Sequence, residues 1–224
     1  MMEIKICGIT SPKEAEYLNK YKVDYAGFVV FFEKSKRYVT LEQAKSIFST
    51  LDPEIKKVAV TVSPTVMQVK MIEDCGFDIL QVHKELSREI LEQITIPVWY
   101  AFNVANVCEL EEKKKYLEQL PKELANKIVA IVLDGSNYGS GIPFDWESSL
   151  KKISLRENFH NRKIILAGGL TAENVARGIR IFQPDMVDVS SGVEGEFGKE
   201  ETKIKEFVAA VKNNKAIRKR RDTT

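Results

Sequence analysis

Two side chains that can exchange protons stand where apolar runs of the chain end. Cys7 closes the first run and is followed at once by Gly8, and Asp134 follows the run 128–133. A thiol acts as a base when its surroundings favour the thiolate, and a carboxylic acid donates a proton when burial raises its pKa. Together they predict general acid–base catalysis. Considered alone, each residue fits a structural role equally well. Cys7 could be a small buried packing residue, and Asp134 could be a loop or helix-capping residue.

Small and hydroxyl-bearing residues follow the last two apolar runs. Gly168 and Gly169 come after one run, and Ser190, Ser191 and Gly192 come after the other. Glycine lets a ligand approach the backbone closely, and hydroxyl and N–H groups in a turn can surround a phosphate. Either group alone is ordinary loop composition. The two together predict a phosphate-binding site.

Four further residues are candidates for contact with a substrate. Arg37 ends a lysine-rich stretch, and arginine is suited to a two-pronged grip on a planar carboxylate. Gln81 and His83 end the fourth run, and Asp188 lies in the last one. For His83, contact with a ligand and a hydrogen-bonded core position are equally compatible with the sequence. No metal site is predicted.

Eight apolar runs rich in β-branched residues must position these groups. Several are continuous rather than alternating, which is typical of parallel strands covered on both faces, and helical patterns separate them. The strict alternation of strand and helix patterns predicts a parallel α/β sheet, which eight units close economically into a single-domain (β/α)8 TIM barrel. In such a barrel the chemistry lies on the loops that follow the strands. A doubly wound open sheet is the alternative, although no GxGxxG follows the first run. The predicted strands are 3–7, 25–30, 57–62, 79–82, 98–102, 128–133, 163–166 and 186–189.

Helix starts are marked by capping residues and first-position prolines. Ser11-Pro12 and Ser63-Pro64 combine the two signals, and Thr40 and Thr171 are each followed by an acidic first turn. Long amphipathic patterns predict further helices over 106–120 and 199–212. The pattern over 145–155 is weaker.

The composition is that of an ordinary soluble globular protein. The 224 residues are 44% hydrophobic and 29% charged, with a formal net charge of +2 that argues against nucleic-acid binding. We expect residues 1–214 to form the barrel and the basic segment 215–224 to be a frayed tail. Three widely spaced cysteines suggest neither a zinc site nor a disulfide framework. Without a signal peptide or a membrane-spanning run, a cytoplasmic protein with reduced thiols is expected.

The motifs resemble those of the phosphoribosylanthranilate isomerase family of tryptophan biosynthesis, in order and over nearly the whole chain. The first and last of them are highly specific. They are KICGIT at 5–10, GFVVFFEKSKR at 27–37, QVHK at 81–84, LDG at 133–135 with GSGIPFDW at 139–146, LAGGL at 166–170 and DVSSGVE at 188–194.

The resemblance implies an Amadori rearrangement of a phosphorylated small molecule, without a metal or an organic cofactor. Cys7 would remove the C2′ proton of the sugar, and Asp134 would protonate the furanose ring oxygen. Arg37 would hold the anthranilate carboxylate, and Asp188 would orient a sugar hydroxyl. The phosphate would bind at Gly169, Ser190 and Ser191. The resemblance leaves open whether the protein is a monomer or a homodimer.

The chain departs from the family pattern at four places. Lys84 stands where glycine is usual, the second loop is one residue longer at 30–32, Phe197 stands where proline is common, and the third strand lacks a frequent phenylalanine in its stretch 58–61. None of these changes removes a proposed catalytic group.

Other functions compete with this assignment. The related histidine-pathway isomerase would carry aspartate in place of Cys7, and a bifunctional enzyme is disfavoured for the same reason. A sugar-phosphate epimerase would need metal ligands at several strand ends, where only His83 is available. A catalytically silent phosphate sensor would be under no pressure to keep both Cys7 and Asp134.

Overall fold

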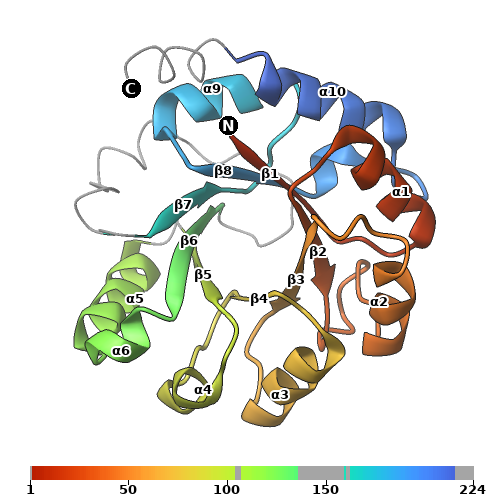
Figure 1. Ribbon diagram of the computed structural model, residues 1–224. Coiled ribbons are helices and arrows are strands. Elements are labelled where there is room, and N and C mark those ends of the chain that lie inside the picture. The colour runs from red at the N-terminus through yellow and green to blue at the C-terminus, as the bar shows by residue number, and fades with distance from the viewer. Residues whose placement is uncertain (1, 104–106, 136–158, 160–161, 215–224) are drawn as a thin grey trace.

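The computed structural model describes residues 2–103, 107–135, 159 and 162–214. Eight parallel strands follow one another in chain order around a closed barrel, in which β1 also pairs with β8 (Figure 1). The strands are β1 (Glu3–Cys7), β2 (Tyr25–Val29), β3 (Lys56–Thr61), β4 (Ile79–Val82), β5 (Val98–Asn103), β6 (Ile128–Asp134), β7 (Lys163–Leu166) and β8 (Met186–Val189). Each bound lies within one residue of the prediction. The predicted barrel is confirmed, and pairing of β1 with β8 excludes the open sheet.

Helices surround the barrel on its outside, as Figure 1 shows. A small hairpin and one turn of 3-10 helix follow β8. The described helices are α1 (Pro12–Tyr21), α2 (Leu41–Phe48), α3 (Val66–Cys75), α4 (Arg88–Gln93), α5 (Val107–Gln119), α6 (Lys122–Ala125), α9 (Val175–Phe182) and α10 (Glu201–Lys212). The short elements are η1 (Ser191–Val193), β9 (Glu194–Gly195) and β10 (Gly198–Lys199).

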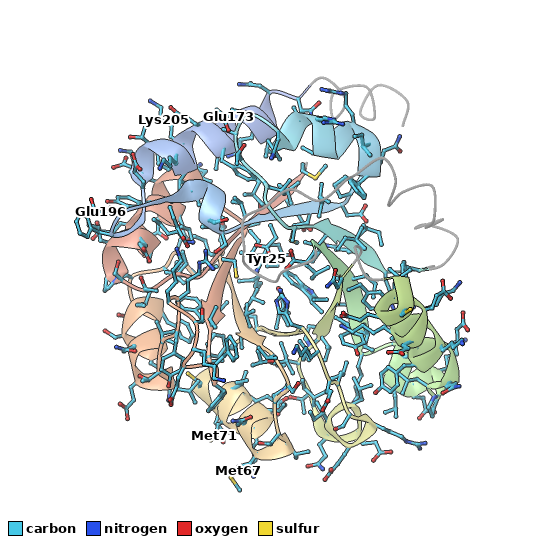
Figure 2. The ribbon with its side chains drawn as sticks, turned by 180° about the vertical axis from the view of Figure 1, so that it is seen from behind. Tyr25, Met67, Met71, Glu173, Glu196 and Lys205 are labelled. Atoms are coloured by element: carbon cyan, nitrogen blue, oxygen red, sulfur yellow. The ribbon has the colours of Figure 1, made fainter. Side chains whose placement is uncertain are left out.

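The apolar side chains form two separate layers. One fills the barrel itself and includes Val60, Trp99 and Ala130. Tyr25, labelled near the centre of Figure 2, packs its ring edge against Trp99 at 5.1 Å between centroids. The larger layer lies between the strands and the helices. Because both faces of each strand are covered, the strands read as continuous apolar runs.

Two predicted helix starts are confirmed and two are displaced. Ser11 and Thr40 cap α1 and α2 as expected. The start predicted at Ser63 is wrong, because the capping position is taken by Thr65. Its hydroxyl accepts from the backbone N–H of Gln68 at 3.2 Å, and Gln68 Oε1 accepts from the Thr65 N–H at 2.9 Å.

The start predicted at Thr171 is also wrong, because residues 171–174 form a turn before α9. The Asn174 side chain accepts from the Thr171 N–H at 2.8 Å and donates to the Gly169 carbonyl at 2.8 Å. This holds the loop after β7 against the first turn of α9. The helix predicted over 145–155, the motif at 139–146 and the tail 215–224 lie outside the described residues.

The surface holds a few exposed apolar side chains. Met67 and Met71 point outward from α3 (Figure 2), and Phe197 is exposed in the turn between β9 and β10. Cys75 is buried at the end of α3, whereas Cys108 is exposed on α5, so a packing role fits only the former. No helix in the described part of the chain is long and apolar enough to cross a membrane.

Candidate active site

A cavity of about 420 Å³ opens among the loops that follow the carboxyl ends of the strands. Its lining contains every predicted site residue except Gly192. The predicted residues that line it are Cys7, Arg37, Gln81, His83, Asp134, Gly168, Gly169, Asp188, Ser190 and Ser191. Residues from the first to the last strand therefore meet in one place, as the strand-end positions predict.

Cys7 lies half-buried at the end of β1, beside Gly27 of β2. A Cβ placed on Gly27 would lie 2.9 Å from the Cys7 Sγ, so this position has no room for a side chain. Burial raises the pKa of the Cys7 thiol, and the nearby cations Lys5 and Lys199 oppose that rise. The thiol is therefore available to a ligand, and its ionisation depends on its charged neighbours.

Sequence reasoning missed Lys5, whose ammonium is buried next to Cys7. Lys5 is 0% exposed and its Nζ lies 2.6 Å from Oδ2 of Asp188, which is 6% exposed. Burial on its own would lower the pKa of Lys5, but the attraction of Asp188 and Cys7 raises it. The other carboxylate oxygen of Asp188 is buried and has no hydrogen-bond partner among the described residues. It can accept a hydroxyl from a ligand in the cavity.

Asp134 ends β6 and is almost fully buried. Burial raises its pKa to about 7, against the lowering effect of a hydrogen bond from the Gly135 N–H at 2.8 Å. Gly168 leaves room for this carboxylate, since a Cβ there would lie 2.7 Å from Asp134 Oδ1. A carboxyl group that titrates near neutral pH can both donate and accept a proton.

Arg37 reaches the cavity from the loop after β2 and is held by Glu194. The Nη2 atom of Arg37 donates to Glu194 Oε2 at 3.0 Å, and Lys36 and Lys199 contact the same carboxylate at 2.8 and 2.7 Å. Burial would raise the pKa of Glu194, but these three cations hold it well below its usual range. Sequence reasoning missed Glu194 and Lys199, because neither lies at a barrel-strand end.

The glycine- and serine-containing loops meet at the side of the cavity near β7 and β8. Gly168 and Gly169 both take positive φ angles, 79° and 65°. The Ser190 hydroxyl donates to the Cys7 carbonyl at 2.8 Å, which joins this loop to the end of β1. The N–H groups at the start of η1 precede its first turn hydrogen bond, which runs from the Val193 N–H to the Ser190 carbonyl at 3.3 Å, and N–H groups in such a turn can bind an anion. Gly192, outside the lining, packs against the Leu170 carbonyl, where a Cβ would collide.

Gln81 and His83 lie on the opposite side of the cavity from this loop pair, at the end of β4. Their Nε2 atoms are 3.0 Å apart, and burial together with Lys5 and Lys113 lowers the pKa of His83 to about 3. The imidazole is therefore neutral and accepts from the Gln81 amide. Gln81 Oε1 is buried without a hydrogen-bond partner among the described residues. Lys84, one of the positions at which the chain departs from the family pattern, lies exposed at the rim of the cavity.

The described residues contain no cluster of three or more side chains suited to a metal ion. Acid–base chemistry on an anionic ligand is what the arrangement supports. It combines a thiol, a carboxyl group with a pKa near neutrality, a guanidinium and a pair of small-residue loops in one cavity.

Comparison with known proteins points in the same direction. A family model described as N-(5'phosphoribosyl)anthranilate (PRA) isomerase matches residues 4–210. An N-(5'-phosphoribosyl)anthranilate isomerase from Thermoanaerobacter sp. (strain X514) is 39% identical over 215 residues, which cover 95% of this chain and 98% of the relative.

Solved structures agree in fold over the same extent. The phosphoribosyl anthranilate isomerase of Thermotoga maritima superimposes with a TM-score of 0.78 at 34% identity, covering 95% of this chain and 99% of the other. A phosphoribosyl anthranilate isomerase in complex with reduced 1-(o-carboxyphenylamino)-1-deoxyribulose 5-phosphate gives 0.76 at 33% identity, with the same coverage.

Proposed function

This chain belongs to the N-(5'-phosphoribosyl)anthranilate isomerase family, and from that premise we propose that Cys7 and Asp134 are the base and the acid of its reaction. The enzyme is an isomerase of tryptophan biosynthesis that converts N-(5-phosphoribosyl)anthranilate into 1-(2-carboxyphenylamino)-1-deoxyribulose 5-phosphate. The observation that supports the assignment is that thiol and carboxyl group line one cavity from β1 and β6, on different sides of the barrel.

The first step opens the furanose ring. Asp134 donates its proton to the ring oxygen as the bond between that oxygen and C1′ breaks. The lone pair of the anthranilate nitrogen moves into a C1′=N double bond, which gives a protonated Schiff base. A carboxyl group with a pKa of about 7 is well matched to this transfer, because it is a stronger donor than water and is still substantially protonated at neutral pH.

The second step removes the proton at C2′. The Cys7 thiolate takes that proton, and the bonding electrons form a C1′=C2′ double bond while the nitrogen regains its lone pair. The resulting enolamine tautomerises to the ketose. The substrate nitrogen is the electron sink, so we propose a reaction that needs no metal or organic cofactor.

Substrate recognition is proposed to divide between the two ends of the molecule. The guanidinium of Arg37 receives the anthranilate carboxylate, and the loops that hold Gly169, Ser190 and Ser191 receive the phosphate. Asp188 accepts a hydrogen bond from a sugar hydroxyl through its unpartnered oxygen. Gln81 and His83 line the side of the cavity opposite the phosphate loops. The reduced ligand of the related structure carries both a carboxyl and a phosphate group, which suits this division.

Replacing Arg37 by alanine is expected to raise KM by roughly ten- to a hundredfold, with a smaller change in kcat. The reason is the loss of a charged hydrogen bond worth about 1.5–3 kcal/mol. Steady-state kinetics measure the effect. Lys36→Ala is the matched control, because Lys36 contacts the same Glu194 carboxylate but is exposed. Equal KM values for Arg37→Ala and wild type would contradict the assignment.

The pH dependence of kcat/KM should be bell-shaped with its acid limb near pH 7. The active enzyme needs a deprotonated thiol and a protonated Asp134, yet burial places the pKa of Asp134 at about 7 and that of Cys7 above its ordinary value. Below pH 7 both groups hold protons and no base is available. Above the thiol pKa both have lost them and no acid remains. A rate that stays constant from about pH 6 to 8 would contradict this scheme.

The activity itself is tested by supplying freshly generated phosphoribosylanthranilate and following the loss of its anthranilate fluorescence. Rapid loss with catalytic amounts of protein is the expected result. No turnover, with phosphate ligands still raising the melting temperature, would indicate a phosphate-binding barrel of different chemistry.

We also propose a cytoplasmic enzyme that works as a monomer or a homodimer on a phosphorylated small molecule, without a nucleic-acid partner. One related structure is described as monomers generated from a dimeric isomerase. Size-exclusion chromatography with light scattering determines the state of this chain.

A further inference from the structure

Lys5 places a positive charge inside a barrel whose interior is largely apolar. Its side chain is fully buried, and the layer around it consists of residues such as Val58, Ile165 and Met186. Taking an ammonium out of water costs several kcal/mol, and a buried ion pair is often no more stable than the apolar side chains that could replace it. Packing therefore does not explain a lysine at this position.

Asp188 holds the Lys5 ammonium in place. The two residues are register partners on the neighbouring strands β1 and β8, and Lys5 Nζ donates to Asp188 Oδ2 at 2.6 Å. Only one carboxylate oxygen is used, and the other is the unpartnered oxygen described above. Lys5 is thus fixed from one side and still has hydrogens for another acceptor.

The other neighbour of the Lys5 ammonium is the Cys7 thiol. Lys5 and Cys7 are two residues apart on β1, so their side chains point to the same face, which is the barrel interior. A Cβ placed on Gly27 would lie 2.9 Å from Cys7 Sγ and 3.0 Å from Lys5 Cε, so both side chains flank the same point. The end of the Lys5 side chain therefore lies near the thiol, where its charge attracts the thiolate.

We propose that Lys5 is a positioning residue of the isomerase reaction, whose ammonium, held by Asp188, is the counter-ion of the Cys7 thiolate. The proposal rests on the proposed function, in which Cys7 is the base. An ammonium beside the thiol favours the charged form of a group that burial otherwise keeps neutral. When Cys7 and Asp134 together have lost one proton, the ammonium also favours the form in which Cys7 is the thiolate and Asp134 keeps its proton. That is the form that the reaction requires.

Three charged groups act on the thiol, and their opposite effects on its pKa allow the proposal to be tested by two variants. Lys5 on the same strand and Lys199 on β10 lower the pKa of Cys7, and Asp188 on β8 raises it. The contact of Lys199 is shared with Glu194 and Ser190, whereas Lys5 has Asp188 as its only other charged partner among the described residues. Removing Lys5 and removing the charge of Asp188 should therefore change the thiol in opposite directions.

The test measures how fast iodoacetamide alkylates Cys7 as a function of pH, without substrate. Mass spectrometry of the peptide that contains Cys7 separates its signal from that of the exposed Cys108. For Lys5→Met, a neutral side chain of similar length, the rate at pH 8 should fall by roughly tenfold, as for a rise of one pKa unit. For Asp188→Asn the rate should increase, because the thiolate becomes the closest anion to the ammonium. Lys5→Arg should restore part of the loss.

Lys113→Met is the matched control for losing a buried lysine. Lys113 donates to the carbonyls of His83 and Ala101 from α5, and it does not act on Cys7. Its loss should lower the melting temperature and leave the alkylation rate of Cys7 unchanged. A merely structural Lys5 would behave in the same way as Lys113.

The possible outcomes distinguish failure of the counter-ion role of Lys5 from failure of the proposed function. An unchanged alkylation profile in folded Lys5→Met overturns the counter-ion role, even if Cys7 is the base. Should Lys5→Met fail to fold, Asp188→Asn decides, and a decreased or unchanged rate in that variant overturns the proposal. Failure of the proposed function would appear elsewhere, as full turnover by an enzyme that lacks the Cys7 thiol.

Discussion

Serine in place of Cys7 is expected to lower kcat by about 10²- to 10⁴-fold while KM changes little. A hydroxyl occupies nearly the same volume as the thiol, so the cavity and its binding groups stay as they are. Its pKa, however, lies far above that of a thiol, so almost none of it is present as the anion that removes the C2′ proton. An effect confined to kcat marks an interaction made in the transition state. Steady-state kinetics with the fluorescent substrate provide both constants.

Cys108→Ser makes the same atomic change on the exposed face of α5 and should leave kcat unaltered. Binding of the reduced product analogue to the Cys7→Ser enzyme, measured by calorimetry, checks that the cavity is intact. Near-normal kcat with Cys7→Ser would remove the thiol from the mechanism.

Asparagine in place of Asp134 is expected to lower kcat by a similar factor of about 10² to 10⁴. The amide keeps the size of the carboxyl group but has no proton of suitable acidity for the ring oxygen. Ring opening then depends on water, which this buried corner of the site admits poorly. The acid limb of the pH profile near 7 should disappear with the carboxyl group that causes it.

Stability should change in the opposite direction to activity in Asp134→Asn. Burial raises the pKa of Asp134 above its unfolded value, so the folded state binds an extra proton between about pH 4 and 7. The stability of the wild type therefore falls as the pH rises through that range, and the full penalty remains above pH 7. An uncharged amide avoids that penalty, and thermal unfolding at pH 8 should show a melting temperature at least equal to that of wild type. Asp24→Asn is the control, because Asp24 accepts from the Ile4 N–H at the opposite end of β1, away from Cys7. It should leave kcat unchanged, and full activity of Asp134→Asn would contradict its role as the acid.

The barrel could be predicted from the sequence because each strand is covered on both faces. Continuous apolar runs such as Ile79–Val82 then stand out from the polar helices, and their ends fix where side chains converge. Cys7 and Asp134 were found because they occupy such ends. Their roles came from the resemblance to a family, and the structure adds the burial and the charges around them.

Lys5, Glu194 and Lys199 could not be predicted because their significance depends on distant partners. Lys5 sits within an apolar run, where a single lysine is usual on a solvated face. Its inward direction becomes clear only when β8 closes against β1. Glu194 contacts Arg37, which is 157 positions away in the chain, and no local sequence pattern predicts such a contact.

The displaced helix starts have a local cause. Thr65 lies two residues after the predicted cap Ser63 and caps α3 in its place through its hydrogen bonds with Gln68. Asn174 does not cap α9 with its side chain, which instead bonds Thr171 and Gly169 and so holds residues 171–174 in a turn before the helix. Errors of this size leave the strand ends, and hence the predicted site, unchanged.

The primary isotope effect on kcat/KM with substrate deuterated at C2′ tests most directly that Asp134 opens the ring and Cys7 removes the C2′ proton. Weakening the base makes proton removal slower relative to ring opening, so Cys7→Ser should show a larger effect than wild type. Weakening the acid makes ring opening limiting, so Asp134→Asn should show an effect close to unity. Equal isotope effects in the two variants, or a larger one in Asp134→Asn, would contradict this division of the chemistry.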